Sequence, residues 1–164
     1  MTITPDTPGV EGLTIRQADR ADLLAVFRIE KAVFPQPWPF ASFEQFLGQP
    51  GFLVAVRGGA VVGYAVSDVT PNHGRDLGHL KDIAVHPSAQ GEGVGRALLE
   101  RVLLTLSVEG ADVVKLEVRE SNDTAQSLYE DVGFEPIRRV PGYYDDGEDA
   151  YVMVLDVAEW HNAG

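Results

Sequence analysis

Short apolar runs alternate with segments of helical periodicity along most of the chain. Apolar-rich runs bounded by turn residues predict strands, and apolar residues at every third or fourth position predict helices. The predicted strands are 13–18, 51–57, 60–69, 79–86 and 112–119, followed by two more that flank Asp146-Gly147. The predicted helices are 20–33, a short one that opens at Ser42, 93–108 and 122–132.

Polar residues, glycines and prolines mark the ends of these elements. Asp19 with Asp22 has the character of a helix cap, and residues 42–45 spell a capping box. Three prolines in residues 34–41 exclude a helix there, and Gly133 suits the residue after a helix end. The dipeptides Gly58-Gly59 and Asp146-Gly147 are typical of hairpin turns.

The order of elements predicts the α/β class. We expect a mixed sheet of about seven strands with four helices on both of its faces. A length of 164 residues suits one domain, which we place at residues 13–160. The first 12 residues, rich in Pro, Gly and Thr, are expected to form a flexible tail.

Composition excludes several classes of function. The net charge of −12 argues against non-specific nucleic-acid binding and suits a cationic partner such as an amine or a basic peptide. No apolar run is long enough for a membrane span, and no signal sequence precedes the domain, so we expect a cytoplasmic protein. The sequence leaves the oligomeric state open between a monomer and a weak dimer.

The side chains that usually bind metals or form covalent intermediates are scarce. The chain has no cysteine, which excludes disulfides and a cysteinyl acyl-enzyme. His73, His86 and His161 lack the spacing of metal ligands, so no metal site is assigned.

A glycine loop between a predicted strand and helix is the leading candidate for a binding site. Gly91, Gly93 and Gly95 precede the helix, whose free N–H groups form a seat for a phosphate. Arg96 stands where a P-loop requires lysine, and the G-x-G-x-G order differs from the dinucleotide fingerprint. The alternative is a turn that uses glycine only for its backbone freedom.

Three ordered motifs carry a family resemblance. Residues 90–95 spell QGEGVG, residues 116–134 spell LEVRESNDTAQSLYEDVGF, and residues 142–153 spell GYYDDGEDAYVM. Together they resemble the GNAT N-acetyltransferase family over roughly residues 13–157. The third motif is similar to the protein N-terminal acetyltransferases of the RimI-like and Ard1-like branches, between which the sequence does not decide.

The resemblance implies the GNAT fold, in which the fourth and fifth strands splay apart. Acetyl-CoA is expected to enter this opening from one side and the acceptor from the other. The residues that the resemblance assigns to acetyl-CoA are Ile83, Ala84, Val85, Gln90, Gly91, Glu92, Gly93, Val94, Gly95, Arg96, Asn122 and Tyr129. Because a carboxylate beside a diphosphate weakens binding, we expect Glu92 to point outward and Arg96 to supply the compensating charge. Asn122 also suits a helix cap.

Glu117 is the candidate general base. It shares a strand face with Lys115 and Arg119, and the resemblance implies that it removes a proton from the acceptor amine. The alternative is a solvated carboxylate on a strand. An N-terminal amine is about a tenth neutral at pH 7, whereas a lysine is neutral less than about one time in a thousand. A carboxylate therefore suits an N-terminal amine better.

Two further residues complete the candidate catalytic set. The resemblance assigns to Tyr129 the role of general acid toward the departing thiolate, whereas helical spacing alone also fits a core tyrosine. His79 begins a strand as in the Ard1-like branch, where the matching histidine is an auxiliary base. The alternative for His79 is a structural histidine.

Two aromatic segments are expected to frame the acceptor. The first contains Phe34, Gln36 and Trp38, and the second contains Tyr143 and Tyr144. Aromatic pairs of this kind also occur as simple packing. The Ard1-like branch often has an acidic residue near Gln36, so the preferred acceptor terminus stays open.

The sequence therefore predicts an enzyme that transfers acetyl from acetyl-CoA to the N-terminal α-amine of a protein by direct attack in a ternary complex. A ribosomal protein is the leading acceptor. One alternative is a GNAT enzyme for a small amine such as an aminoglycoside, a polyamine or an amino acid. The other is a non-catalytic acyl-CoA-binding or partner-binding module, which the presence of both Glu117 and Tyr129 disfavours.

Overall fold

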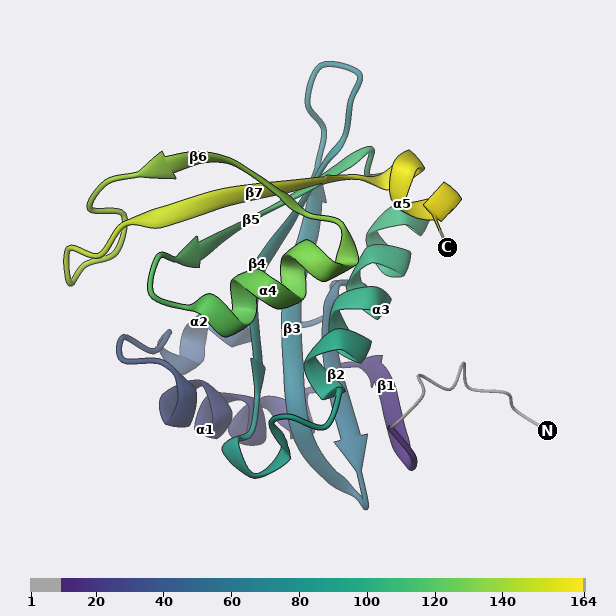
Figure 1. The fold of residues 1–164 in the computed structure, drawn as a ribbon. Helices are drawn as coiled ribbons and strands as arrows, with labels where there is room; N and C mark the ends of the chain where they lie inside the picture. The colour runs from purple at the N-terminus through teal and green to yellow at the C-terminus, as the bar shows by residue number, and fades with distance from the viewer. Residues whose placement is uncertain (1–9, 164) are drawn as a thin grey trace. The chain divides into compact units, whose positions relative to one another are not determined.

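The structure is a computed structural model that describes residues 10–163. Its strands are β1 (Leu13–Gln17), β2 (Phe52–Arg57), β3 (Ala60–Thr70), β4 (Leu77–Val85), β5 (Val113–Arg119), β6 (Glu135–Val140) and β7 (Ala150–Asp156). Its helices are α1 (Leu23–Val33), α2 (Phe40–Glu44), α3 (Val94–Val108), α4 (Asp123–Val132) and α5 (Val157–Ala163), with the 3-10 turns η1 (Arg20–Asp22) and η2 (Pro87–Ala89). The strands pair in the order β1-β2-β3-β4-β5-β7-β6 (Figure 1). This mixed seven-stranded sheet confirms the predicted α/β class.

The chain divides into two compact units. Unit 1 contains the chain up to Ser67 together with Asp82–Val102, and unit 2 contains Asp68–Lys81 together with the chain from Leu103 onward. β3, β4 and α3 contribute residues to both units. The glycine loop thus belongs to unit 1, whereas the three candidate catalytic residues belong to unit 2.

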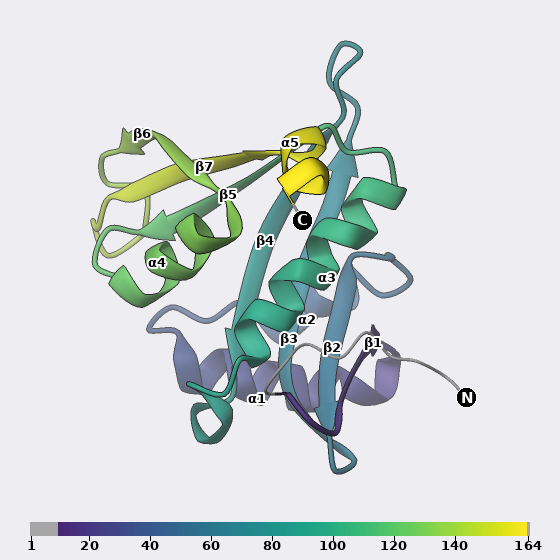
Figure 2. The same ribbon diagram turned by 45° about the vertical axis from the view of Figure 1, so that its right-hand side comes forward.

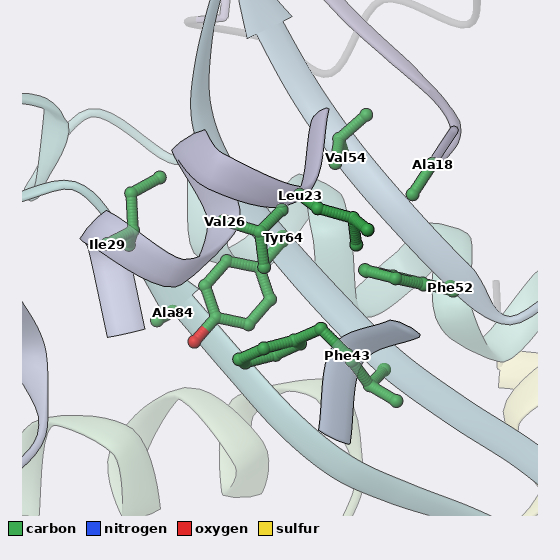
Figure 3. Close-up of a cluster of buried hydrophobic side chains, with 10 residues drawn as sticks. Ala18, Leu23, Val26, Ile29, Phe43, Phe52, Val54, Tyr64 and Ala84 are labelled. Atoms are coloured by element: carbon green, nitrogen blue, oxygen red, sulfur yellow. The ribbon is translucent and has the colours of Figure 1, made fainter. Parts of the chain in front are cut away.

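Unit 1 buries one large apolar cluster between a sheet face and two helices. Tyr64 of β3 lies among side chains of α1 and α2, including Val26 and Phe43, and all three are fully buried (Figure 3). Successive residues of a strand face opposite sides. A methyl group built on Gly63 would accordingly meet the α3 side chains of Val94 and Leu98. Within this unit α1 and the start of α3 therefore cover opposite faces of β3 (Figure 2).

Unit 2 is organised around β5. Val114, Leu116 and Val118 are buried, whereas Lys115 and Glu117 between them are only partly so. Gly78 of β4 lies next to Val114 and to Leu106 of α3, so the end of α3 packs on the apolar side of β5. The alternation leaves the opposite side of β5 to its charged residues.

The neighbours of β5 fix its register. β7 pairs with β5 over its whole length in antiparallel register, from Val113 opposite Asp156 to Arg119 opposite Ala150. β4 pairs with β5 in parallel register, from Leu77 opposite Val113 to Leu80 opposite Leu116. Both strands extend beyond these paired residues. The expected divergence of β4 and β5 stays a prediction.

Several predicted boundaries agree with the structure. Asp19 and Asp22 form the expected capping box at η1, and Asn122 accepts the Ala125 N–H at the start of α4 with an N···O distance of 3.1 Å. Gly58 and Gly59 adopt positive φ angles of 57° and 78° between β2 and β3, as a tight hairpin turn requires. Local polar and glycine signals therefore located these ends correctly.

Three details of the prediction are wrong. The structure has five α-helices instead of four, because α5 begins directly after β7, where Asp156 accepts the Glu159 N–H. The short second helix begins at Phe40 with Pro39 as its N-cap, so the capping box at residues 42–45 does not form and residues 40–41 are helical. The earlier start allows Phe43 to reach the core, where it is fully buried.

Two predictions concern the beginning of the chain and its domain organisation. Of the expected tail over residues 1–12, residues 1–9 lie outside the described part of the chain. Val10 is buried, and its side chain lies 3.3 Å from the position that a Cβ atom on Gly93 would occupy. The assignment of residues 13–160 to a single domain stays a prediction.

Gly51 is expected to tolerate no side chain. A Cβ on Gly51 would lie 2.3 Å from the Ser67 carbonyl oxygen and 2.4 Å from its Oγ, while the Ser67 N–H donates to the Gly51 carbonyl. Gly51→Ala should lower the free energy of unfolding by about 1–3 kcal/mol, measured by urea denaturation. The loss should persist in a Ser67→Ala background, because the backbone oxygen remains. Unchanged stability would contradict this close approach.

Candidate functional site

The Glu117 carboxylate lies at the centre of a charged group in unit 2. Its side chain is only 11% exposed, and its Oε1 lies 2.6 Å from Nε2 of His79 on β4. Lys115 Nζ, two residues earlier on the same face of β5, lies 3.4 Å from Oε2. Both carboxylate oxygens therefore have a partner, as a largely buried carboxylate requires.

These neighbours keep Glu117 ionised. Burial raises the pKa of the Glu117 carboxyl, but the hydrogen bond and charge of His79 and the charge of Lys115 outweigh it. The net result is a pKa below the ordinary 4.5. Glu117 is thus a carboxylate at neutral pH, ready to accept a proton but only a weak base.

The other ring nitrogen of His79 faces a second cation. Lys81 Nζ lies 3.5 Å from His79 Nδ1 and 3.7 Å from Asp68 Oδ2. Because a carboxylate only accepts, Nε2 of His79 donates the hydrogen bond to Glu117, and Nδ1 is the nitrogen that faces Lys81. The Asp68–Lys81 pair thus supports the orientation of His79 toward Glu117.

The connection between β6 and β7, residues 141–149, is held to the charged face of β5 by Arg119. Arg119 Nη1 lies 2.8 Å from both Asp146 and Glu148, and its guanidinium stacks 4.1 Å from the centre of the Tyr144 ring. Tyr143 packs edge-on against Tyr144, with 5.0 Å between the ring centres. One cation therefore orders the loop that carries both candidate tyrosines.

Both tyrosines of this loop have raised pKa values. Burial and the negative charge of Glu117 raise the pKa of Tyr143. Burial, together with the charges of nearby acidic groups, raises the pKa of Tyr144 to about 12 despite Arg119. Each phenol thus keeps its proton at neutral pH and remains a hydrogen-bond donor.

Tyr129 and Asn122 are both on or next to α4, also in unit 2. Tyr129 is buried at 6% exposure, and its ring packs edge-on against Phe134 with centres 5.9 Å apart. This packing agrees with the core position that helical spacing predicts for the Tyr129 ring. A buried ring of this kind is compatible with a functional role for its hydroxyl group. Asn122 uses its side chain as the helix cap described above.

In unit 1, the glycine loop has the backbone conformation that its sequence predicts. Gly91 and Gly93 adopt positive φ angles of 80° and 88°, whereas Gly95 is already inside α3. A Cβ on Gly91 would meet no atom within 4 Å, so the loop there faces open space. Gln90 Nε2 donates to the Val85 carbonyl over 3.0 Å and ties the loop to β4. A loop of this kind before a long helix fits a diphosphate.

The charges on this loop are compensated. Glu92 is 46% exposed and pairs with Arg57 of β2 at 2.5 Å, while Arg96 pairs with Glu100 one turn along α3 at 2.9 Å. Arg57 therefore neutralises the carboxylate for which the sequence suggested Arg96 as the compensating charge. No local sequence pattern indicates this pairing, because the two residues are distant in the chain.

The proline-rich segment after α1 belongs to unit 1 as well. Trp38 packs on Phe43 and Phe46 with ring-centre distances of 5.4 and 6.0 Å, and its backbone N–H donates to Glu30 over 2.8 Å. Phe34 is half-buried and Gln36 is exposed. The segment thus combines an anchored aromatic side chain at Trp38 with an exposed glutamine at position 36.

The structure brings the candidate residues together in two groups. Unit 2 holds Glu117 with His79 and places the Glu117 charge near Tyr143 and Tyr144. Unit 1 holds the glycine loop and the proline-rich segment. Sequence reasoning identified Lys115 only as a neighbour on the strand and missed Asp68 and Lys81. The alternation of polar residues around His79 was a usable signal for Lys81. Among residues 10–163, no three His, Cys, Asp or Glu side chains cluster as metal ligands, and no helix combines the length and apolarity of a membrane span.

Comparison with known proteins gives consistent matches. The model of the acetyltransferase (GNAT) family matches residues 23–134. An N-alpha-acetyltransferase of Sulfolobus acidocaldarius is 35% identical over 164 aligned positions, which cover 93% of this chain and 98% of the relative. The N-alpha-acetyltransferase RimI of Mycobacterium tuberculosis is 39% identical, with 92% and 96% covered.

A solved structure agrees with these relatives. The crystal structure of the ribosomal-protein-S18-alanine N-acetyltransferase from Escherichia coli superimposes with a TM-score of 0.78 at 33% identity. The match covers 88% of this chain and 94% of that one. The fold is therefore shared over nearly the full length of both proteins.

Removal of His79 should raise the pKa of Glu117. His79→Ala takes away the hydrogen bond and charge that lower this pKa, while burial still raises it. In the parent the lowered pKa means that the carboxylate stabilises the fold above about pH 4.5 and that this contribution is lost as the pH falls through the lowered value. In the variant, the loss of this stabilising contribution should begin at a higher pH.

The measurement is a 13C NMR titration of the glutamate carboxyl carbons, with Glu117→Gln to assign the signal. His161→Ala on α5 is the control, because this exposed histidine should leave the Glu117 titration unchanged. An unchanged midpoint in His79→Ala would refute the interaction.

Proposed function

This chain belongs to the acetyltransferase (GNAT) family, and from that membership we propose that it transfers an acetyl group from acetyl-CoA to the N-terminal α-amine of a protein. The observation that carries the proposal is Glu117, a largely buried carboxylate kept ionised beside protonated tyrosines. Relatives named as N-alpha-acetyltransferases and aligned over nearly their full length support the same acceptor class.

The reaction needs one proton acceptor and one proton donor. Glu117 takes the proton from the acceptor ammonium, and the freed amine attacks the acetyl carbonyl carbon. The new C–N bond forms as the C–S bond breaks, and the nitrogen then releases its second proton to solvent. Tyr129 donates its proton to the departing thiolate and regains one from solvent, or it stabilises the thiolate by a hydrogen bond. Because the chain has no cysteine, transfer is direct and passes through no cysteinyl acyl-enzyme.

The low basicity of Glu117 favours an N-terminal amine. A carboxylate with a lowered pKa gains little from taking a proton off an ammonium whose pKa is near 10.4. An N-terminal amine with a pKa near 8 is about a tenth neutral at pH 7, so the same base suffices. In this proposal His79 donates to Glu117 through Nε2 and orients the base, and it passes a proton onward only by exchanging tautomers.

In this proposal the substrates are assigned to the residues that the family resemblance indicates. The glycine loop and the start of α3 hold the diphosphate through backbone N–H groups, and acetyl-CoA, when bound, supplies the activated thioester. The full proposed set for acetyl-CoA is Ile83, Ala84, Val85, Gln90, Gly91, Glu92, Gly93, Val94, Gly95, Arg96, Asn122 and Tyr129.

The acceptor peptide is assigned to the two aromatic segments. Tyr143 and Tyr144 keep their phenolic protons and can donate to backbone carbonyls of the peptide. Phe34, Gln36 and Trp38 form the other wall. A ribosomal protein terminus that begins with alanine is the leading acceptor, supported by the likeness to the S18-alanine enzyme. A cytoplasmic location accords with such an acceptor.

Glu117→Gln is expected to lower kcat at least about a hundredfold, because glutamine keeps the shape of the side chain but accepts no proton. Binding of acetyl-CoA, measured by calorimetry, should persist. The matched control is Glu109→Gln, an exposed residue after α3 that should retain full turnover. Full activity of Glu117→Gln would exclude general-base catalysis, and joint loss of binding and turnover would indicate a structural role.

A panel of acceptors separates the peptide from the small-amine alternative. An alanine-initiated peptide should show kcat/KM at least about tenfold above free amino acids, polyamines and aminoglycosides, because the aromatic walls bind its backbone. The same peptide with a formylated N-terminus and an internal lysine should gain no acetyl group by mass spectrometry. Preferential acetylation of a small amine would overturn the assignment.

A further inference from the structure

A second carboxylate, Glu30 of α1, is buried in the apolar cluster of unit 1. It is only 1% exposed, and both of its oxygens accept hydrogen bonds. Tyr64 donates its hydroxyl proton to Oε1, and the Trp38 backbone N–H donates to Oε2 over 2.8 Å. A buried charge is costly unless it is fully hydrogen-bonded, so the two bonds explain how Glu30 is tolerated there.

Asp82 of β4 completes this cluster. Its Oδ2 lies 3.3 Å from the Tyr64 hydroxyl oxygen. Burial raises the pKa of Asp82, and the adjacent Glu30 carboxylate raises it further. Burial likewise raises the pKa of Tyr64, which stays a donor. The Tyr64 hydroxyl and the Trp38 backbone N–H both donate to Glu30, which accepts from each of them.

Glu30 contacts both ends of the proline-rich segment. Its backbone carbonyl accepts the Phe34 N–H over 3.0 Å at the end of α1, and its side chain accepts the Trp38 N–H. Residues 35, 37 and 39 are prolines without an N–H, so few backbone donors in this segment are able to form a hydrogen bond. The bond from Trp38 is one of them, and a single residue thus fixes where the segment starts and where it returns to the core.

We propose that Glu30 is a positioning residue for acceptor binding, which clamps the segment from Phe34 to Trp38 in the shape that receives the peptide. This inference rests on the proposed function, because it assumes that this segment is one wall of the acceptor site. The Trp38 ring packed on Phe43 and Phe46 adds the apolar half of the same anchor. Glu30 itself is buried below the segment and does not touch the acceptor.

Glu30→Met tests the clamp with a side chain of similar length. Methionine has no oxygen to accept the Trp38 N–H, so the hydrogen bond that holds the end of the segment is lost. The KM for the acceptor peptide should rise about tenfold, while kcat and the KM for acetyl-CoA change less than about twofold. A general loss of kcat with an unchanged peptide KM would overturn the proposal.

Tyr64→Phe is the matched control. It removes the other bond to Glu30 in the same core but leaves the Trp38 N–H bond in place. Its stability should fall, because a hydroxyl partner of a buried carboxylate is lost, while the peptide KM should stay within about twofold. An equal rise of the peptide KM in Tyr64→Phe would show that core damage, and not the clamp, controls acceptor binding.

Trp38 provides a readout that needs no substrate. The chain has two tryptophans, so Trp160→Phe leaves Trp38 as the sole emitter. In that background Glu30→Met should shift the emission to the red and increase quenching by acrylamide. In the parent, the Trp38 amide should exchange slowly with deuterium, a measurement that does not depend on the folding of any variant. Rapid exchange of this amide or unchanged emission would overturn the clamp.

Failure of the proposed function and failure of the Glu30 clamp would give different results. If no amine is acetylated by the parent protein, the proposed function fails, while emission and exchange still test the clamp. If the emission shifts but the peptide KM does not, the clamp exists and its role in acceptor binding is refuted. A shift in both supports the full inference.

Discussion

The alternation of side chains along β5 is the constraint on which the candidate chemistry depends. Val114, Leu116 and Val118 are buried on one side of β5, so Lys115, Glu117 and Arg119 must face the other side. A shift of one residue in the register would bury all three charges and expose the apolar residues. The full-length pairing with β7 prevents such a shift, and the packing of the core thereby fixes the position of the candidate base.

The residues around Glu117 depend on this placement in turn. His79 reaches Glu117 from β4, one strand away, while Arg119 holds the loop of Tyr143 and Tyr144 through its stack and its two acidic partners. The stack and the ion pairs share one guanidinium, which limits the freedom of the loop more than separate contacts would. The charges of one strand therefore organise both the base and one proposed wall of the acceptor site.

The sequence predicted what local signals encode. Capping residues located the starts of η1 and α4, and paired glycines located the β2–β3 turn. It placed α2 wrongly, because the burial of Phe43 outweighed a correctly spelled capping box. It missed α5, although the Asp-x-x-Glu pattern at Asp156 was a usable signal.

The candidate site likewise combines residues that sequence motifs predicted with contacts that only the structure reveals. Motifs named Glu117 and His79, and the structure joins them at 2.6 Å. The pairing of Arg57 with Glu92 and the contact of Glu30 with Tyr64 link residues more than thirty positions apart. No local pattern specifies such pairs, because tertiary folding alone brings them together. From the sequence alone, Glu30 is indistinguishable from an ordinary polar residue of an amphipathic helix.

Two carboxyl groups show how environment divides proton chemistry within one chain. Glu117 has cationic or donating neighbours in Lys115 and His79, which lower its pKa despite burial. Asp82 has Glu30 as its neighbour, and burial and that negative charge raise its pKa. The environment of Glu117 therefore favours its ionised form, whereas the environment of Asp82 favours the protonated form. Of these two carboxyl groups, Glu117 is the one suited to accept a proton from an acceptor amine.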